Sequence, residues 1–281
     1  MRARNAVLGA LACVALLALV WFAAFHVGFF RHLDQSIFLQ FADLKAHGRI
    51  AWTARHFVRL FDLNPYVYLV LVPLVIALLR RRPHIVLAVG AIVLGANVTT
   101  EVLKHVLAAP RPASLFAGGV SPLPPASWPS GHSTAVMALV LASVLASPAR
   151  LRPLVAALGA SLAIAIGYSL LATGTHYPSD VLGGFLVAAT WTFCAVAALL
   201  AAERWRSAGR ASHDRVSIRA ALGAPGAVVV AALLISLVLV MVRTHDVFSY
   251  VQAHRAFVLG AAGIAALSLT LATGLLLIVR R

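Results

Sequence analysis

Long apolar runs recur along the whole chain, and they constrain the fold more than any other feature. Crossing the hydrocarbon core of a bilayer takes about 20 apolar helical residues. Of the 281 residues, 62% are hydrophobic and 11% are charged, so the bilayer must act as the solvent. The sequence predicts an all-α, polytopic transmembrane helix bundle with about eight transmembrane helices. The runs lie at residues 6–30, 66–79, 84–107, 133–147, 154–175, 180–202, 220–242 and 257–279.

Basic residues concentrate in the short segments between alternate runs. Cytoplasmic loops of membrane proteins are enriched in arginine and lysine. With the N-terminus in the cytoplasm, the inside segments hold 14 of the 23 basic residues, which predicts that both termini are inside. This distribution explains the formal net charge of +15 through membrane orientation, without a nucleic-acid partner. The inside residues are Arg2, Arg4, Arg80, Arg81, Arg82, Arg150, Arg152, Arg204, Arg206, Arg210, Arg215, Arg219, Arg280 and Arg281.

The segment between the first two runs mixes aromatic and basic side chains. Residues 31–64 include Trp52 and Phe57 together with Lys45 and Arg49. Such a mixture suits the headgroup zone, so we expect an interfacial amphipathic segment. Its alternative is a solvated connector. We expect the first helix to be retained, because its apolar stretch lacks a clear cleavage site for a signal peptidase.

Two polar clusters follow the third run. Lys104 and Arg111 lie seven residues apart at the outer end of that run, and prolines then stop the helix. Trp128-Pro129-Ser130-Gly131-His132-Ser133 opens the next run. Gly131 lets the backbone approach a ligand closely, and the free N–H groups of a helix N-terminus favour an anion.

A third cluster, Gly174-Thr175-His176-Tyr177-Pro178-Ser179-Asp180, lies between the fifth and sixth runs. His176 and Asp180 are four residues apart, so the carboxylate can orient and polarise the imidazole. The helix count places all three clusters on the same outer face. Polar groups beside apolar runs are costly and mark candidate sites of chemistry.

Each of these residues also has a structural explanation when it is considered alone. Lys104 can extend its ammonium to the headgroups, Arg111 can contact lipid, and Ser130 can cap a helix. His132 and His176 are each more often structural than catalytic in such positions. The combination favours phosphoryl transfer, in which cations and N–H groups bind phosphate oxygens while a nucleophile and an acid act in line.

At these residues the chain resembles the type 2 phosphatidic acid phosphatase (PAP2) superfamily, in its membrane-bound lipid phosphatase branch. The signatures Lys-x6-Arg-Pro and Pro-Ser-Gly-His match in full. In the third signature, Ser-Arg-x5-His-x3-Asp, Ser169, His176 and Asp180 match, but Leu170 stands at the arginine position. The resemblance implies a PAP2-like core of six helices followed by two C-terminal helices. Residues 1–65 hold the first transmembrane helix and the outer interfacial loop, 66–202 form the catalytic core, and 203–281 hold a basic cytoplasmic loop and the two further helices.

The resemblance also implies a role for each residue. His176 would attack phosphorus and form a phosphohistidine, Asp180 would orient it, and His132 would protonate the leaving oxygen. Phosphate would be bound by Lys104, Arg111, Ser130 and Gly131. We expect no metal and no other cofactor, since the sequence has no carboxylate cluster for magnesium. Loss of one charge-stabilising donor typically costs about 3–4 kcal/mol, so Leu170 implies slow turnover or a substitute group, for which His105 and Arg255 are candidates.

The expected substrate is a membrane lipid phosphate or diphosphate, of the isoprenyl diphosphate, phosphatidic acid, phosphatidylglycerol phosphate or lipid A type. We expect the site on the periplasmic face of a bacterial inner membrane. Two alternatives use the same residues: a lipid phosphotransferase with the same intermediate, and a weakly active protein that binds lipid phosphates. A transporter fits less well, because the polar residues gather at one face and not at the middle of the membrane.

Overall fold

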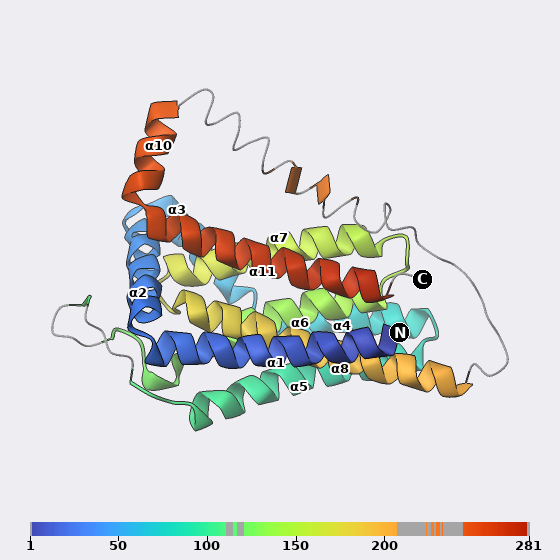
Figure 1. Ribbon diagram of the computed structural model, residues 1–281. Helices are drawn as coiled ribbons and strands as arrows, with labels where there is room; N and C mark the ends of the chain where they lie inside the picture. Colours follow the sequence, from blue (N-terminus) through green and yellow to red (C-terminus); the bar gives the residue numbers. More distant parts are fainter. Residues whose placement is uncertain are drawn as a thin grey trace.

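The computed structural model describes residues 2–110, 115–116, 121–206, 223, 226–227, 229–230, 232 and 244–279. All regular secondary structure in these residues is helical, and the long helices lie side by side (Figure 1). The predicted all-α polytopic bundle is therefore confirmed. The helices are α1 Arg2–His26, α2 Gly28–Ala42, α3 Gly48–Arg59, α4 Leu63–Leu79, α5 Pro83–Val106, α6 Gly131–Ala146, α7 Arg152–Ala172, α8 Pro178–Arg206, α10 Thr244–Ala253 and α11 Arg255–Val279, with 3-10 helices η1 Asp43–Ala46 and η3 Pro125–Ser127.

Six of the described helical segments are long and apolar enough to cross a membrane. A bent pair, α3 and α4, adds up to one more, with a bend of 60° between its two helices. The chain is therefore an integral membrane protein. The predicted run at 220–242 falls largely outside the described residues. The six segments are α1, α5, Pro125–Ala146, α7, α8 and α11.

Helix α6 lies at the centre of the bundle. In the span that contains it, 83% of the most apolar window is buried, against 17% for α1 at the periphery. It packs against α4, α5, α7, α8 and α11. Glycine permits one of these contacts, because a Cβ on Gly159 of α7 would lie 2.5 Å from Cγ1 of Val140 on α6. The central position fixes the N-terminus of α6 in the middle of one end of the bundle.

The segment after the first helix differs from the expectation in its structure. The run predicted at 6–30 is broken at Val27, where the backbone is extended (φ −101°, ψ 114°), and α2 then runs crosswise to α1 (Figure 1). The segment at 31–64, expected to be interfacial and amphipathic, is mostly helical, with α2, η1 and α3 following one another. Hydropathy did not show this break, because apolar residues continue across it at Phe29 and Phe30. The interfacial position of this segment stays a prediction.

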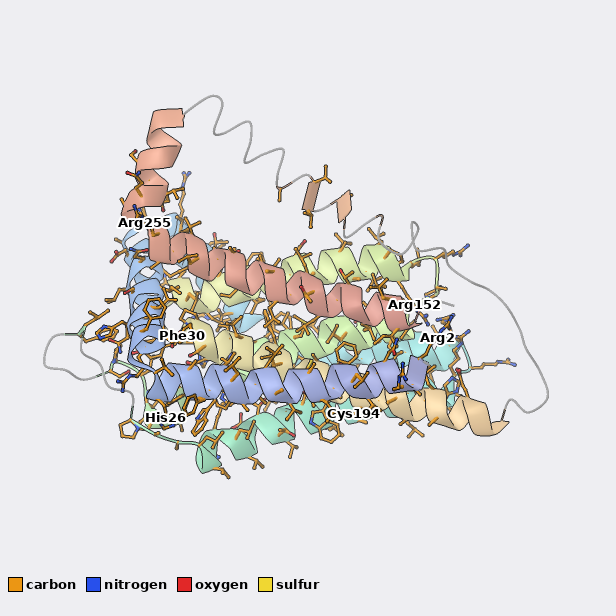
Figure 2. The ribbon with its side chains drawn as sticks, viewed as in Figure 1. Arg2, His26, Phe30, Arg152, Cys194 and Arg255 are labelled. Atoms are coloured by element: carbon orange, nitrogen blue, oxygen red, sulfur yellow. The ribbon has the colours of Figure 1, made fainter. Side chains whose placement is uncertain are left out.

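The two ends of the bundle carry different groups. The N-terminus and the end of α11 lie at the same end, here called the terminal end, with Arg2 and Arg152 (Figure 2). Arg152 donates to the carbonyls of Val279 (2.6 Å) and Ser147 (3.2 Å) and so satisfies free acceptors at helix ends. The opposite end, here called the site end, holds the described residues of the three polar clusters.

Candidate active site

The third cluster is built around a buried carboxylate. Asp180 lies in the first turn of α8 and is 0% exposed. Its Oδ2 lies 3.3 Å from Nδ1 of His176 and accepts the backbone N–H of Tyr177 at 3.0 Å. A carboxylate beside one imidazole nitrogen holds the proton there and leaves the other nitrogen, Nε2, free to act as a base or nucleophile. The His176 side chain is 14% exposed, so the ring is accessible at one edge.

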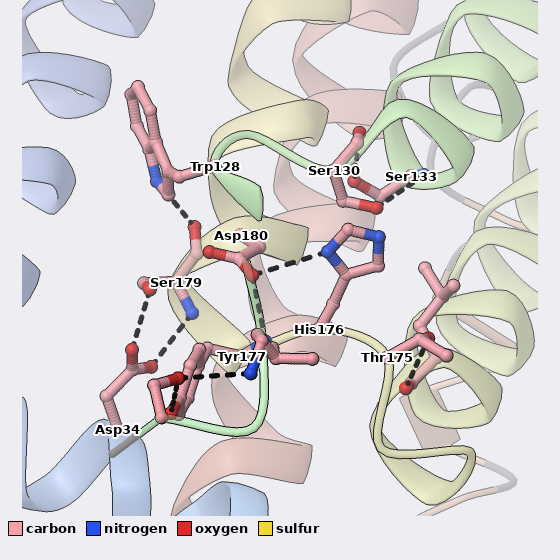
Figure 3. A network of polar contacts seen from close by, with 12 residues as sticks. Asp34, Trp128, Ser130, Ser133, Thr175, His176, Tyr177, Ser179 and Asp180 are labelled. Atoms are coloured by element: carbon pink, nitrogen blue, oxygen red, sulfur yellow. Dashed lines mark hydrogen bonds and ion pairs between the residues drawn. The ribbon is translucent and has the colours of Figure 1, made fainter. Parts of the chain in front are cut away.

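The second cluster meets the third directly. The backbone N–H of Ser130 donates to the carbonyl of Asp180 at 3.0 Å. Figure 3 shows the His176 ring between Asp180 and the turn that carries Ser130 and Ser133, with its outer edge toward that turn. His176, in the turn between α7 and α8, therefore faces the N-terminus of α6.

Ser130 is the N-cap of α6. Its Oγ accepts the Ser133 N–H at 3.4 Å, and the residue is 0% exposed. The Ser130 carbonyl accepts the hydroxyls of Ser133 (3.0 Å) and Thr134 (2.9 Å). Capping, considered above as an alternative for Ser130, is thus present in the structure, and it orders the first turn of α6, which carries Gly131 and His132.

Lys104 reaches the second cluster from the last turn of α5. A Cβ added to Gly131 would lie 3.2 Å from the Lys104 ammonium, so the absence of a side chain leaves room for the lysine. The ammonium also forms an ion pair of 2.7 Å with Glu101, one turn earlier on the same helix. Part of its charge is therefore already neutralised. Arg111, the second cation predicted in this cluster, lies outside the described residues.

His132 has a carboxylate partner that the sequence motifs do not contain. Its Nε2 lies 3.1 Å from Oδ1 of Asp62, which directly precedes α4. Both side chains are partly exposed, at 32% for His132 and 55% for Asp62. The contact places the Asp62 carboxylate next to His132, the proposed proton donor. An isolated aspartate before an apolar run was the only sequence signal, and helix packing alone decides that it meets His132.

A second carboxylate, which the sequence motifs do not contain, holds the start of α8. Asp34 of α2 accepts the Ser179 N–H at 2.9 Å and the Ser179 hydroxyl at 2.7 Å, and both residues are buried (Figure 3). Trp128 donates its indole N–H to the Ser179 carbonyl at 3.2 Å. The start of α8 is thus bonded to α2 and to the loop before α6, and both loops of the site are fixed together.

The residue at the position where the motif has an arginine is part of the hydrophobic core. Leu170 is 0% exposed and belongs to the main hydrophobic cluster. Ser169 donates its hydroxyl to the Ala165 carbonyl at 2.7 Å on its own helix. His105 and Arg255 are the candidate substitutes for the missing arginine. Nδ1 of His105 lies 2.7 Å from the Glu101 carbonyl oxygen, and Arg255 is the first residue of α11.

In the described part of the chain, no three His, Cys, Asp or Glu side chains are grouped to hold a metal ion.

The fold and the site define a class of protein before any comparison. A polytopic helical membrane protein carries, at one end of its bundle, a histidine–aspartate pair, a second histidine, a lysine and a helix N-terminus. Residues 85–205 match the model of the PAP2 superfamily, and this match supports membership of that superfamily. The match contains all three clusters but neither Asp34 nor Asp62. No curated protein and no solved structure was found to match the chain. Membership of the superfamily indicates a phosphatase that acts on phosphate esters.

Proposed function

We propose that the protein removes phosphate from a membrane lipid phosphate or diphosphate through a phosphohistidine on His176. The observation that carries this proposal is the His176–Asp180 pair facing the N-terminus of α6 at one end of a membrane bundle. A phosphate placed there would meet a nucleophilic nitrogen on one side and backbone N–H groups and Lys104 on the other.

The proposed reaction has two steps. Nε2 of His176 forms a bond to phosphorus while the bond to the leaving oxygen breaks, and His132 donates a proton to that oxygen. Water then attacks the phosphohistidine, His132 accepts a proton from the water, and phosphate leaves. Asp180 keeps Nδ1 of His176 protonated in both steps. Lys104, Arg111 and Gly131 bind the non-bridging oxygens, while Ser130, as the N-cap, orders the first turn of α6, which carries Gly131. No metal takes part in this scheme.

The lipid nature of the substrate is proposed from the position of the site. It lies where α5 ends and α6 and α8 begin, next to the crosswise helix α2, and so at the depth where lipid headgroups would lie. A lipid with its acyl or isoprenyl tail in the bilayer can present its phosphate at this depth. We further propose that this end faces the periplasm of a bacterial inner membrane, because the basic residues concentrate at the terminal end.

The proposal is tested by phosphate release from purified protein with a panel of lipid phosphates, with and without chelator. We expect release that a chelator leaves intact. His176→Ala should abolish it, and His132→Ala should slow it by about 100-fold or more, the usual contribution of an acid–base group. Activity lost on chelation and restored by magnesium would overturn the metal-independent scheme. Full activity in His176→Ala would overturn the nucleophile.

The same assay separates a hydrolase from a transferase. Labelled phosphate should appear in water as free phosphate even when an acceptor alcohol is present. Label found mainly in the alcohol would show that the protein is a phosphotransferase. An acid-labile label on the wild-type protein, absent from His176→Ala, would be the direct sign of the phosphohistidine.

A further inference from the structure

A lysine from outside the matched segment covers the turn that carries His176. Gly174 adopts a left-handed conformation (φ 63°) between α7 and α8, two residues before His176. A Cβ added to Gly174 would lie 2.5 Å from Nζ and 2.9 Å from Cε of Lys45. Lys45 belongs to η1, far away in the sequence. The Lys45 side chain therefore ends beside the partly buried backbone of Gly174 in this turn.

The Lys45 ammonium is free to take an anion. Within the described ranges Lys45 forms no hydrogen bond and no ion pair, and the residue is exposed. Lys104, the other described cation at the site, is paired with Glu101 at 2.7 Å. An uncompensated ammonium beside the catalytic turn is thus the stronger source of positive charge for a bound phosphate.

The turn itself does not need the lysine for its hydrogen bonds. The last carbonyls of α7 already have partners: that of Leu171 accepts the Gly174 N–H at 2.8 Å, and that of Leu170 accepts the Thr175 N–H at 3.2 Å. This pairing is the usual way to end a helix with a left-handed glycine. A purely structural role for Lys45 would therefore rest only on a weak attraction to the helix terminus.

We propose that Lys45 is a phosphate-binding residue of the His176 site, a role that rests on the phosphatase function proposed above. Its three N–H donors on a flexible stem can reach the non-bridging oxygens of a phosphate held at His176. It supplies the positive charge that Leu170, buried in the core, cannot supply. The cation thus comes from the segment between α2 and α3 and not from α7.

The test compares Lys45→Met with Lys45→Arg, which keeps the charge, and with Arg49→Met, which removes a charge from an exposed site on the first turn of α3. KM, kcat and inhibition by inorganic phosphate are measured for a lipid phosphate substrate. Lys45→Met should raise both KM and the inhibition constant by about tenfold or more, as expected for a lost charge-assisted contact. Lys45→Arg should retain most of the phosphate affinity, and Arg49→Met should match the wild type. Wild-type KM and phosphate inhibition in Lys45→Met would overturn the inference.

Failure of the proposed function has a different signature. If the wild type releases no phosphate, or if His176→Ala remains active, the phosphatase scheme fails whatever Lys45 does. In that case, phosphate binding by Lys45 is tested by the rise in unfolding temperature that inorganic phosphate causes. A rise in the wild type that is absent from Lys45→Met supports phosphate binding by Lys45, and equal rises or no rise in either protein refute it. Unfolding temperatures without phosphate identify a variant that is simply misfolded.

Discussion

The Leu170 side chain lies in the hydrophobic core, although the corresponding motif position holds an arginine. The neighbouring backbone is closely bonded, because the Leu170 carbonyl accepts the N–H and the hydroxyl of Thr175. The residue thus serves packing and the turn before His176. The charge expected at this position has to come from another part of the chain, and Lys45 is the described cation next to that turn.

Leu170→Arg should therefore fail to improve the enzyme. A guanidinium at this buried position costs several kcal/mol of desolvation, so we expect a lower unfolding temperature and no gain in kcat/KM. Leu170→Met keeps the volume and should cost less than about 1.5 kcal/mol. Unfolding in detergent and kcat/KM are measured for both variants. A clear gain in kcat/KM for Leu170→Arg at wild-type stability would show that the site merely lacks a cation that position 170 can supply.

At the scale of elements, α2 lies across the site end and stabilises it. It contributes a carboxylate to the start of α8, through the Asp34–Ser179 hydrogen bonds. Phe38 of the same helix packs on Tyr177, with ring centroids 4.8 Å apart. Because Tyr177 lies between His176 and the start of α8, α2 holds the turn that positions the nucleophile.

Removing the Asp34 carboxylate should loosen this turn. Asp34→Ala loses two buried hydrogen bonds, and we expect a loss of about 1–3 kcal/mol in stability together with a lower kcat. Asp34→Asn keeps one acceptor oxygen and should lie between Asp34→Ala and the wild type. Asp43→Ala changes an exposed aspartate of the same segment and serves as control. Wild-type kcat and stability in Asp34→Ala would show that α2 does not position the site.

At the scale of the whole molecule, the two ends of the bundle carry different polar groups. Arginines cap helix ends at the terminal end, where Arg80 donates to the Ala146 carbonyl at 2.8 Å and Arg152 to that of Val279. The site end holds His132 and His176 with their carboxylate partners. A central α6 connects the two ends, with its N-terminus in the site and its C-terminus beside the arginines.

The positive-inside rule then assigns a compartment to each end. In a protein whose native cysteines Cys13 and Cys194 are replaced by alanine, we introduce Arg49→Cys at the site end or Arg81→Cys at the terminal end. An impermeant thiol reagent added to intact cells should label the first and not the second, and disruption of the cells should expose the second. Labelling of Arg81→Cys in intact cells would invert the topology.

The sequence by itself determined the all-helical class, most of the helices and the residue types of the site. Hydropathy and loop charge act locally, so runs such as 84–107 and 154–175 correspond to α5 and α7 within a few residues. The spacing of His176 and Asp180 within one turn is likewise local. Arg111 and most of 220–242 lie outside the described residues, and their predictions stay predictions.

Only the tertiary structure decided which distant residues meet. The break at Val27, the crosswise course of α2, and the contacts of Asp62 with His132, Asp34 with Ser179 and Lys45 with Gly174 depend on how helices pack. Each of these contacts joins segments far apart in the chain, and no local pattern of hydropathy or spacing encodes it. They arise because burying the apolar faces of α6, α7 and α8 leaves α2, η1 and the start of α4 in fixed positions around the candidate site.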